Sequence, residues 1–297
     1  MNKNLLHCLA VLTLAFLAGK CELTAQSVDI GRSQSNSVAE GRAKTKGYEF
    51  RSIDYPGGEL SQVYDFNAKT AVGCVDFDAF AFDGSSYVLL NIPGAINSCG
   101  YGINTSGKIV GEYNDSTGIH GFLYDGSRYT TIDYPGATIT YAYDINDAGL
   151  IVGSYLAPNS IVYNGFLCVN GTFTAINFPG ADQNFAYGIN SRGDIVGTYS
   201  LAGMDNGFLL TNGNYSTVDF PEADNTEAFG INDAGSITGY YYANLREDHG
   251  FTNTDGAFHE VVVPGAVDTM LFRIKDNGNV AGIVVDGLLE EHGIIGR

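Results

Sequence analysis

The sequence Y-G-I-N-S-R-G-D-I-V-G, from Tyr187 to Gly197, recurs along the chain in six copies. Close relatives of it begin at Tyr101, Tyr143 and Phe229, and weaker copies begin at Tyr64 and Phe272. The glycines that close the copies lie 38 to 44 residues apart, at Gly73, Gly111, Gly153, Gly197, Gly239 and Gly282. A nearly constant period in this range is typical of repeat architectures.

One repeat, residues 140–181, contains four short runs of aromatic and β-branched residues, separated by turns rich in Gly, Asn and Asp. None of these runs has the periodicity of a helix. The Gly and Asn residues suit hairpin turns, because such turns require positive φ angles. Four antiparallel strands in about 42 residues match one propeller blade. The sequence therefore predicts an all-β fold, a six-bladed β-propeller with four-stranded antiparallel blades.

The two ends of the repeat region complement each other. The C-terminal copy contains three of the four expected strands, ending at residues 292–295, and lacks the outermost one. Residues 48–57 have the pattern of an outermost strand with no partner strands before it. Pairing of this N-terminal strand with the C-terminal blade would close the ring and remove two exposed sheet edges.

Three segments are expected along the chain. Residues 1–25 have the pattern of a signal peptide, with an apolar run from Leu5 to Ala18. Residues 26–47 are polar and lack aromatic residues, which predicts a disordered leader. Residues 48–297 then form the propeller domain. A secreted protein is expected, located outside the cell, on its surface or in a periplasm, and no segment after residue 25 is apolar over the length of a membrane-spanning helix.

Charge and cysteine usage narrow the classes of partner. The formal net charge is −18, and from residue 48 onward 30 acidic residues face 9 basic ones. The electrostatic field of this negative charge repels nucleic acid and anionic lipid, so neither is expected as a partner. The protein is expected to be a monomer. Cys74 and Cys99 are predicted to form a disulfide, because both fall near the ends of strands in adjacent blades and export permits oxidation.

A second motif begins the third strand of the repeats. It reads His120-Gly121-Phe122, His249-Gly250-Phe251 and His292-Gly293-Ile294, and the other copies replace the histidine, as in Asn164-Gly165-Phe166, Asn206-Gly207-Phe208 and Asp78-Ala79-Phe80. Together with the N-x-x-G core, this pattern resembles the predicted extracellular repeat family named for a His-Ala-Phe motif, and the blade is similar to that of NHL-type six-bladed propellers. The resemblance implies the fold and transfers no function. Ring symmetry separates the histidines, so we expect a repeated structural hydrogen bond and no metal or cofactor.

Charged residues are expected in the central channel. Asp65, Asp144 and Arg273 occupy a position that is glycine in the other copies, and Glu227 lies on the same innermost strand of its repeat. Arg273 is predicted to pair with Asp65 across the closing junction, because an unpaired buried charge is costly. Carboxylates around a channel also suit a hydrolase or lyase, and this stays an alternative. The sequence has no nucleophile or histidine beside them, which favours a protein that is not an enzyme.

The connections between the second and third strands differ in length, whereas the other turns hardly vary. Variation of this kind on a constant scaffold is typical of a recognition surface. At the same rim the second strands end in tyrosines that suit stacking on sugars or side chains, namely Tyr113, Tyr155, Tyr199 and Tyr241. We therefore expect a secreted binding protein for a protein or glycan partner. The remaining alternative is a structural module of an extracellular surface.

Overall fold

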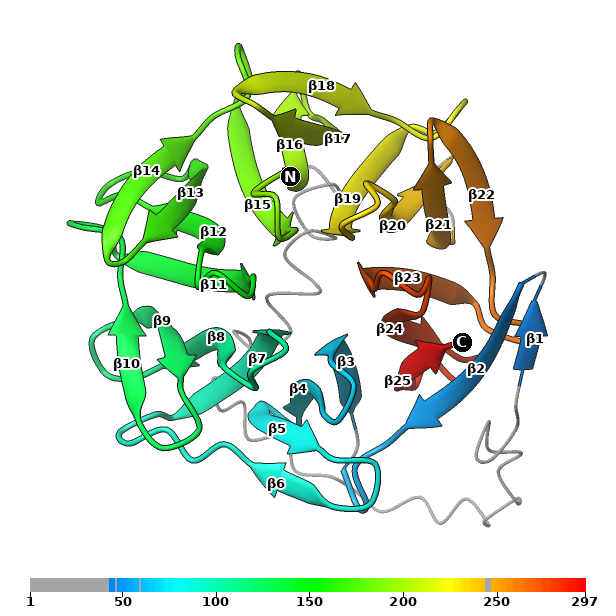
Figure 1. Ribbon diagram of the computed structural model, residues 1–297, viewed down its shortest axis with the longest axis horizontal. Coiled ribbons are helices and arrows are strands. Elements are labelled where there is room, and N and C mark those ends of the chain that lie inside the picture. Colours follow the sequence, from blue (N-terminus) through cyan, green and yellow to red (C-terminus); the bar gives the residue numbers. More distant parts are fainter. Residues whose placement is uncertain (1–42, 46, 59, 244–246) are drawn as a thin grey trace, which may run out of the picture. The chain divides into compact units, whose positions relative to one another are not determined.

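A computed structural model describes residues 43–45, 47–58, 60–243 and 247–297. All of these residues belong to one compact unit, Gly41–Arg297. It contains 25 β-strands, and the described residues include no helix. In Figure 1 the strands of this unit form sheets arranged around a centre. No helix among the described residues is long and apolar enough to cross a membrane.

Three sheets have four strands each, paired antiparallel in the order of the sequence. They consist of β3 (Ser61–Phe66), β4 (Ala71–Val75), β5 (Asp78–Phe82) and β6 (Tyr87–Leu89); β15 (Gln183–Ile189), β16 (Ile195–Leu201), β17 (Met204–Thr211) and β18 (Asn214–Val218); and β19 (Asn225–Ile231), β20 (Ile237–Tyr242), β21 (His249–Thr254) and β22 (Ala257–Val261). The first strand of each sheet lies nearest the centre of the ring and the last lies outermost (Figure 1).

An eight-stranded sheet contains two further units of the same kind. They are β7 (Asn97–Ile103), β8 (Ile109–Asn114), β9 (Ile119–Tyr124) and β10 (Tyr129–Ile132), followed by β11 (Ile139–Ile145), β12 (Ile151–Leu156), β13 (Tyr163–Val169) and β14 (Thr172–Ile176). One parallel contact, Ile139 opposite Ile119, joins β11 to β9. Hydrogen bonding therefore forms five sheets, of which three have the four strands predicted for every blade. Glycine permits this contact: a Cβ atom at Gly118 would lie 2.9 Å from the carbonyl oxygen of Thr138.

The fifth sheet joins the two ends of the domain. Its strands are β1 (Ala43–Thr45), β2 (Tyr48–Ile53), β25 (Glu291–Gly296), β24 (Val280–Val285) and β23 (Asp268–Ile274), in that order. The predicted pairing of the N-terminal strand with the C-terminal strand is confirmed, because β2 runs antiparallel to β25. Ala43–Thr45, which belong to the expected leader, pair with β2. Residues 1–42 and 46, with the signal segment and most of that leader, lie outside the described residues.

The repeated glycines and phenylalanines account for the packing inside each sheet. Gly197 on β16 lies opposite Phe208 on β17, and the phenylalanine is fully buried. A Cβ atom at Gly197 would lie 1.9 Å from the carbonyl oxygen of Phe185 and 2.8 Å from the ring of Phe208. Only glycine fits there, and the aromatic ring covers it. The same pairing occurs at Gly73, Gly111, Gly153 and Gly239, which lie opposite Phe80, Phe122, Phe166 and Phe251.

Candidate functional site

The central channel is narrow where the innermost strands carry glycine. A Cβ atom at Gly102 would lie 2.8 Å from the Cα atom of Asp144, and one at Gly188 would lie 2.4 Å from the carbonyl oxygen of Phe229. These distances leave no room for a side chain, so adjacent backbones approach closely. The side chains that occupy the channel therefore come from the three repeats without this glycine, at Asp65, Asp144 and Arg273.

Arg273 fills the axis of this channel. Its guanidinium donates to the backbone oxygens of Tyr143 at 2.6 Å and Phe272 at 2.9 Å. Longer hydrogen bonds reach the oxygens of Phe229 at 3.2 Å and Tyr101 at 3.4 Å. The residue is 5% exposed. One side chain thus connects four different innermost strands, β7, β11, β19 and β23.

Two carboxylates neutralise this guanidinium, and a lysine shares one of them. Arg273 Nε lies 3.8 Å from Asp65 Oδ2 and 3.7 Å from Asp144 Oδ2. Lys275 Nζ lies 2.6 Å from Asp65 Oδ1. Asp65 also accepts the N–H of Ile103 at 2.9 Å. Burial raises the pKa of Asp144, an effect that Arg273 opposes and Asp65 reinforces. The predicted contact of Arg273 with Asp65 is present, and Asp144 shares it.

A cavity of about 560 Å³ lies between the charged group of Arg273, Asp144 and Lys275 and the end of the channel at which the Asn-x-x-Gly turns lie. Each turn asparagine donates its side-chain N–H to the equivalent backbone oxygen of the next repeat, at 2.9 to 3.3 Å. The donors are Asn67, Asn104, Asn146, Asn190 and Asn232, and the last acceptor is Lys275. Because these amides are engaged, the mouth of the cavity offers few free groups to a ligand. The cavity is therefore a weaker candidate site than its size suggests.

The opposite end of the channel is closed by a circle of six aromatic rings, one from each repeat. Ring centroids of neighbours lie 4.2 to 5.6 Å apart, in the order Tyr64, Tyr101, Tyr143, Tyr187, Phe229, Phe272 and back to Tyr64. Glu112 on β8 accepts a hydrogen bond from the Tyr101 hydroxyl at 3.0 Å. Burial raises the pKa of Glu112 to about 7, although this hydrogen bond lowers it. An acid of this pKa can gain or lose a proton near neutral pH.

Glu227, the other predicted channel acid, is placed differently from Asp65 and Asp144. It is buried and accepts a hydrogen bond from the hydroxyl of Tyr240, on the adjacent strand, at 2.8 Å. Sequence reasoning missed Glu112. The signal for it was available, because the same position after the closing glycine holds no acid in any other repeat, as Cys74, Ser154, Thr198, Tyr240 and Ile283 show.

The three motif histidines share one arrangement. Each directs Nδ1 at a carboxylate at the outer edge of its sheet: His120 at Asp133 (2.8 Å), His249 at Glu260 (2.7 Å) and His292 at Asp54 (3.2 Å). The expected structural hydrogen bond at this position is therefore present. The second ring nitrogen faces an acid of the preceding connection, Asp115 at 3.4 Å, Glu247 at 4.0 Å and Asp286 at 3.8 Å.

The four tyrosines proposed as ligand contacts pack against the protein itself. Three stack face to face on a ring that follows an outermost strand: Tyr155 on Tyr134, Tyr199 on Phe178 and Tyr241 on Phe220, with centroids 3.5, 3.8 and 3.7 Å apart. The hydroxyl of Tyr113 lies 2.9 Å from that of Thr131. Tyr199 is 6% exposed, so the expectation of an exposed ring is wrong there. These rings stabilise contacts between repeats.

Cys74 and Cys99, the pair suggested by the sequence, are bonded as a disulfide. Their Cα atoms lie 4.9 Å apart, on β4 and β7 of consecutive repeats. Cys168 is a buried free thiol. The disulfide adds a covalent link between two sheets that also share a backbone hydrogen bond from Ser98 to Phe77 at 2.8 Å. It lies beside Glu112, which pairs opposite Cys99.

The variable face consists of the connections between second and third strands and those between consecutive repeats. Its second-to-third-strand connections span residues 76–77, 115–118, 157–162, 202–203, 243–248 and 286–290. Most of the exposed large apolar side chains of the described residues lie on this face: Phe77, Ile96, Ile161, Val162, Leu201, Met204, Leu288 and Leu289. Ile161 is 91% exposed and Leu289 74% exposed. The sequence does not reveal this set, because the residues stand singly in loops of different length.

Two of these apolar tips have unusual backbone angles. Phe77 has a φ angle of 75° and Leu289 one of 65°. Bulky residues with positive φ are rare and strained, and such strain concentrates at functional positions. The variable face thus combines unequal loops, exposed apolar tips and local strain, whereas the opposite face consists of uniform turns whose polar groups are paired.

No protein-family model matches the chain, and no curated protein matches it in sequence. Solved structures that resemble it include TolB from Acinetobacter baumannii, with a TM-score of 0.53 and 10% identity over 81% of this chain and 64% of TolB. The SapL1 lectin in complex with alpha methyl fucoside has a TM-score of 0.52 and 11% identity, over 79% of this chain and 92% of the lectin. A mutant of AofleA from Arthrobotrys oligospora has a TM-score of 0.52 and 14% identity, over 84% and 87% of the two chains. At such low identities these likenesses concern the fold alone, and with the strand pairing they establish an all-β propeller with four-stranded antiparallel blades.

Proposed function

We propose that this protein is an exported, non-enzymatic propeller of six blades, counting the eight-stranded sheet as two, that binds a protein partner through its variable face. The six-membered aromatic circle and the six Asn-x-x-Gly-like turns support the blade count. The disulfide Cys74–Cys99 and the apolar N-terminal run support export, because disulfides persist in oxidising compartments. The repeats also support membership of the His-Ala-Phe extracellular family.

The observation that carries the binding function is the exposed apolar set on the variable face. Exposed apolar side chains that gather on one face mark interaction surfaces. Aliphatic and aromatic side chains of this kind become the buried centre of protein interfaces. The uniform turns of the opposite face carry no comparable set among the described residues.

A protein partner fits these residues better than a glycan. Sugar recognition relies on exposed aromatic rings flanked by polar groups. The tyrosines that would serve this purpose stack on Tyr134, Phe178 and Phe220 instead. Ile161, Met204 and Leu288 are aliphatic or thioether side chains. Acidic residues stand beside these tips, including Asp76, Asp115, Asp182, Asp224 and Asp286. The partner surface is therefore apolar and bordered by basic side chains.

The test compares two matched variants of the full chain. The face variant carries Ile161→Ser, Met204→Ser and Leu288→Ser, and the control variant carries Val88→Ser and Val169→Ser, which are exposed apolar positions away from that face. Proteins from the source's extracellular fluid are retained on each immobilised variant and identified by mass spectrometry. We expect the same partner with wild type and control, and its loss with the face variant.

Two results would contradict the proposal. One is retention of the same proteins by all three samples. The other is a glycan-array signal, or turnover of ester, lactone or glycoside substrates, that persists in the face variant. Loss of such turnover on substitution of Glu112 would support the enzyme alternative instead, because Glu112 is a half-buried acid beside the aromatic circle with a pKa of about 7.

A further inference from the structure

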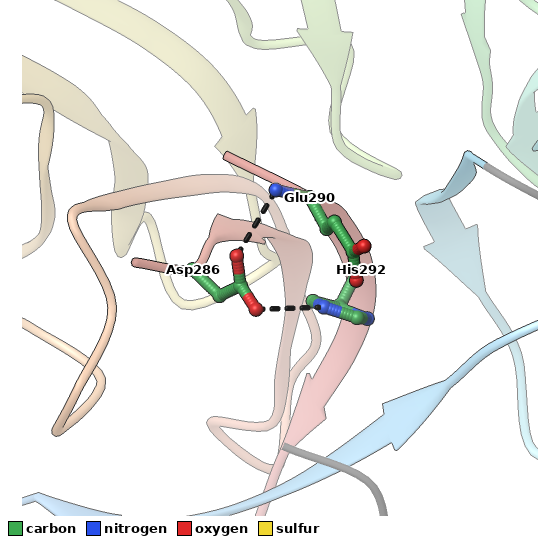
Figure 2. A group of neighbouring side chains, drawn as sticks. All are labelled: Asp286, Glu290 and His292. Carbon is green, nitrogen blue, oxygen red and sulfur yellow. Dashed lines mark hydrogen bonds and ion pairs between the residues drawn. The ribbon is translucent and has the colours of Figure 1, made fainter. Parts of the chain in front are cut away.

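The connection between β24 and β25 folds around the carboxylate of Asp286. Asp286 Oδ1 accepts the backbone N–H of Leu288 at 2.7 Å and that of Glu290 at 3.0 Å. The N–H of Leu289 donates to the backbone oxygen of Asp286 at 3.0 Å. These hydrogen bonds turn the chain back, so that Glu290 and His292 lie beside Asp286 (Figure 2). Asp286 Oδ2 is left facing the imidazole of His292.

The orientation of His292 is fixed from the opposite side. Asp54, which follows β2, lies with Oδ1 3.2 Å from His292 Nδ1. An ionised carboxylate only accepts hydrogen bonds, so Nδ1 carries the proton. In the neutral imidazole, Nε2 then has a free lone pair. A carboxylate that holds one ring nitrogen while the other binds a metal is a recurring feature of metal sites.

That lone pair has no hydrogen-bond partner among the described residues. His292 Nε2 is buried, and its side chain is 17% exposed. The nearest carboxylate oxygen is Asp286 Oδ2, at 3.8 Å, which is too far for a hydrogen bond. Two ligand atoms on one cation, each about 2.1 Å from it, lie up to about 4 Å apart. The separation observed here fits a bridging ion.

The other two histidines give an internal comparison. His120 Nε2 lies 2.8 Å from the hydroxyl of Thr117, so its second nitrogen is already engaged. The acid beside His249 is Glu247, whose side chain is 62% exposed and 4.0 Å away. His292 alone among the three combines a buried, unpartnered nitrogen with a nearly buried acid, since the side chain of Asp286 is 8% exposed.

We propose that Asp286, Glu290 and His292 bind a divalent zinc ion, with Asp54 as the residue that positions His292. One ligand atom from each of the three residues lies within 4.8 Å of the others. Histidine nitrogen and carboxylate oxygen are both zinc ligands, and three protein ligands leave a position for water or for a partner's side chain. This site departs from the sequence expectation of no metal. It is independent of the proposed binding function, although it lies in a connection of the variable face.

The test uses the full chain without a polyhistidine tag, stripped of metal with EDTA and titrated with zinc chloride by calorimetry at neutral pH. We expect one saturable site. Glu290→Gln removes an exposed ligand without disturbing the fold and should weaken zinc binding by tenfold or more. Asp54→Asn should weaken it by about 10- to 100-fold, as loss of a supporting residue does. His292→Gln should abolish it.

His120→Gln is the matched control, because it changes the equivalent histidine of another repeat and should leave zinc binding unchanged. Cobalt(II) provides a second readout, since ligation by His292 should give a visible absorption band that is absent from the His292→Gln variant and needs a higher cobalt concentration in the Glu290→Gln variant. The proposal is overturned if zinc does not bind saturably, or if binding is unchanged in both of those variants. Equal weakening by His120→Gln, or saturable binding of calcium and not zinc, would also overturn it.

Discussion

Replacement of Arg273 by methionine tests whether this side chain holds the centre of the ring together. The change keeps the apolar stem and removes the guanidinium, which donates to backbone oxygens of four strands and faces Asp65 and Asp144. Removing one partner of a buried ion pair costs about 3–5 kcal/mol. Lys275 still neutralises Asp65, so the uncompensated charge is mainly that of Asp144. We expect a loss of about 4 kcal/mol in the free energy of unfolding.

The measurement is urea unfolding followed by circular dichroism, for wild type, Arg273→Met, Asp144→Asn and the double variant. Because the two residues are in contact, their effects should not add, and the double variant should recover about 2 kcal/mol relative to the sum. Burial already raises the pKa of Asp144, and loss of Arg273 raises it further. The cost of Arg273→Met should therefore shrink as the pH falls, because Asp144 takes up a proton.

Three outcomes would refute this reasoning. A loss of less than about 1 kcal/mol for Arg273→Met would show that water or backbone movement replaces the guanidinium. Strict additivity of the two substitutions would show that Asp144 does not depend on Arg273. A cost that grows with decreasing pH would contradict the assigned sign, since protonation removes the uncompensated charge.

Glu112→Gln retains an acceptor for Tyr101 and removes the ionisable group. Since the pKa of Glu112 is raised to about 7, wild type should match the variant below about pH 4.5. As the pH rises from about 4.5 to about 7, wild type should lose about 3 kcal/mol relative to the variant, as measured by urea unfolding. Reduction of Cys74–Cys99, or the Cys74→Ser/Cys99→Ser variant, should lower the free energy of unfolding by about 3 kcal/mol, because the bond closes a loop with a sequence separation of 25 residues. An unchanged melting temperature would exclude a structural role for the disulfide. Deletion of residues 48–58 removes β2 and should abolish soluble, cooperatively folding protein, whereas a truncated chain that melts like wild type would contradict closure by β2.

The repeat pattern is strong enough to predict the strands and the closure, because both depend on local periodicity. The ring closes as expected. Residues 48–57 have the sequence pattern of an outermost strand, and the C-terminal repeat was the one without an outermost strand to pair with its third strand, β25. The contact of Arg273 with Asp65 follows from equivalent positions on adjacent innermost strands. The bonds of Arg273 to Tyr101 and Tyr143 do not follow, because they depend on the width of the channel, which only the assembled backbone defines.

The tyrosine positions show a second limit of sequence reasoning. Tyr155 ends an alternating strand and looks exposed, but its stacking partner Tyr134 belongs to the preceding repeat. Contacts between repeats leave no periodic signal within either one. The same holds for Ile119 and Ile139, whose parallel contact joins two sheets through a glycine-containing connection. The loop lengths predict which face of the ring varies between repeats, while the exposed apolar side chains on that face became visible only in the structure.

The asparagine amides at the turns have a consequence for how the chain can change in length. Each amide points to the following repeat, from Asn67 through to Lys275, and Lys275 turns its own side chain to Asp65 of the first repeat. Open solenoids gain and lose copies freely, because each copy meets only its neighbours. Here, excision or duplication of one copy would alter the curvature that brings Lys275 of the last repeat to Asp65 of the first. The number of copies is therefore fixed by the geometry of the circle, and we expect the ring to unfold as one cooperative unit.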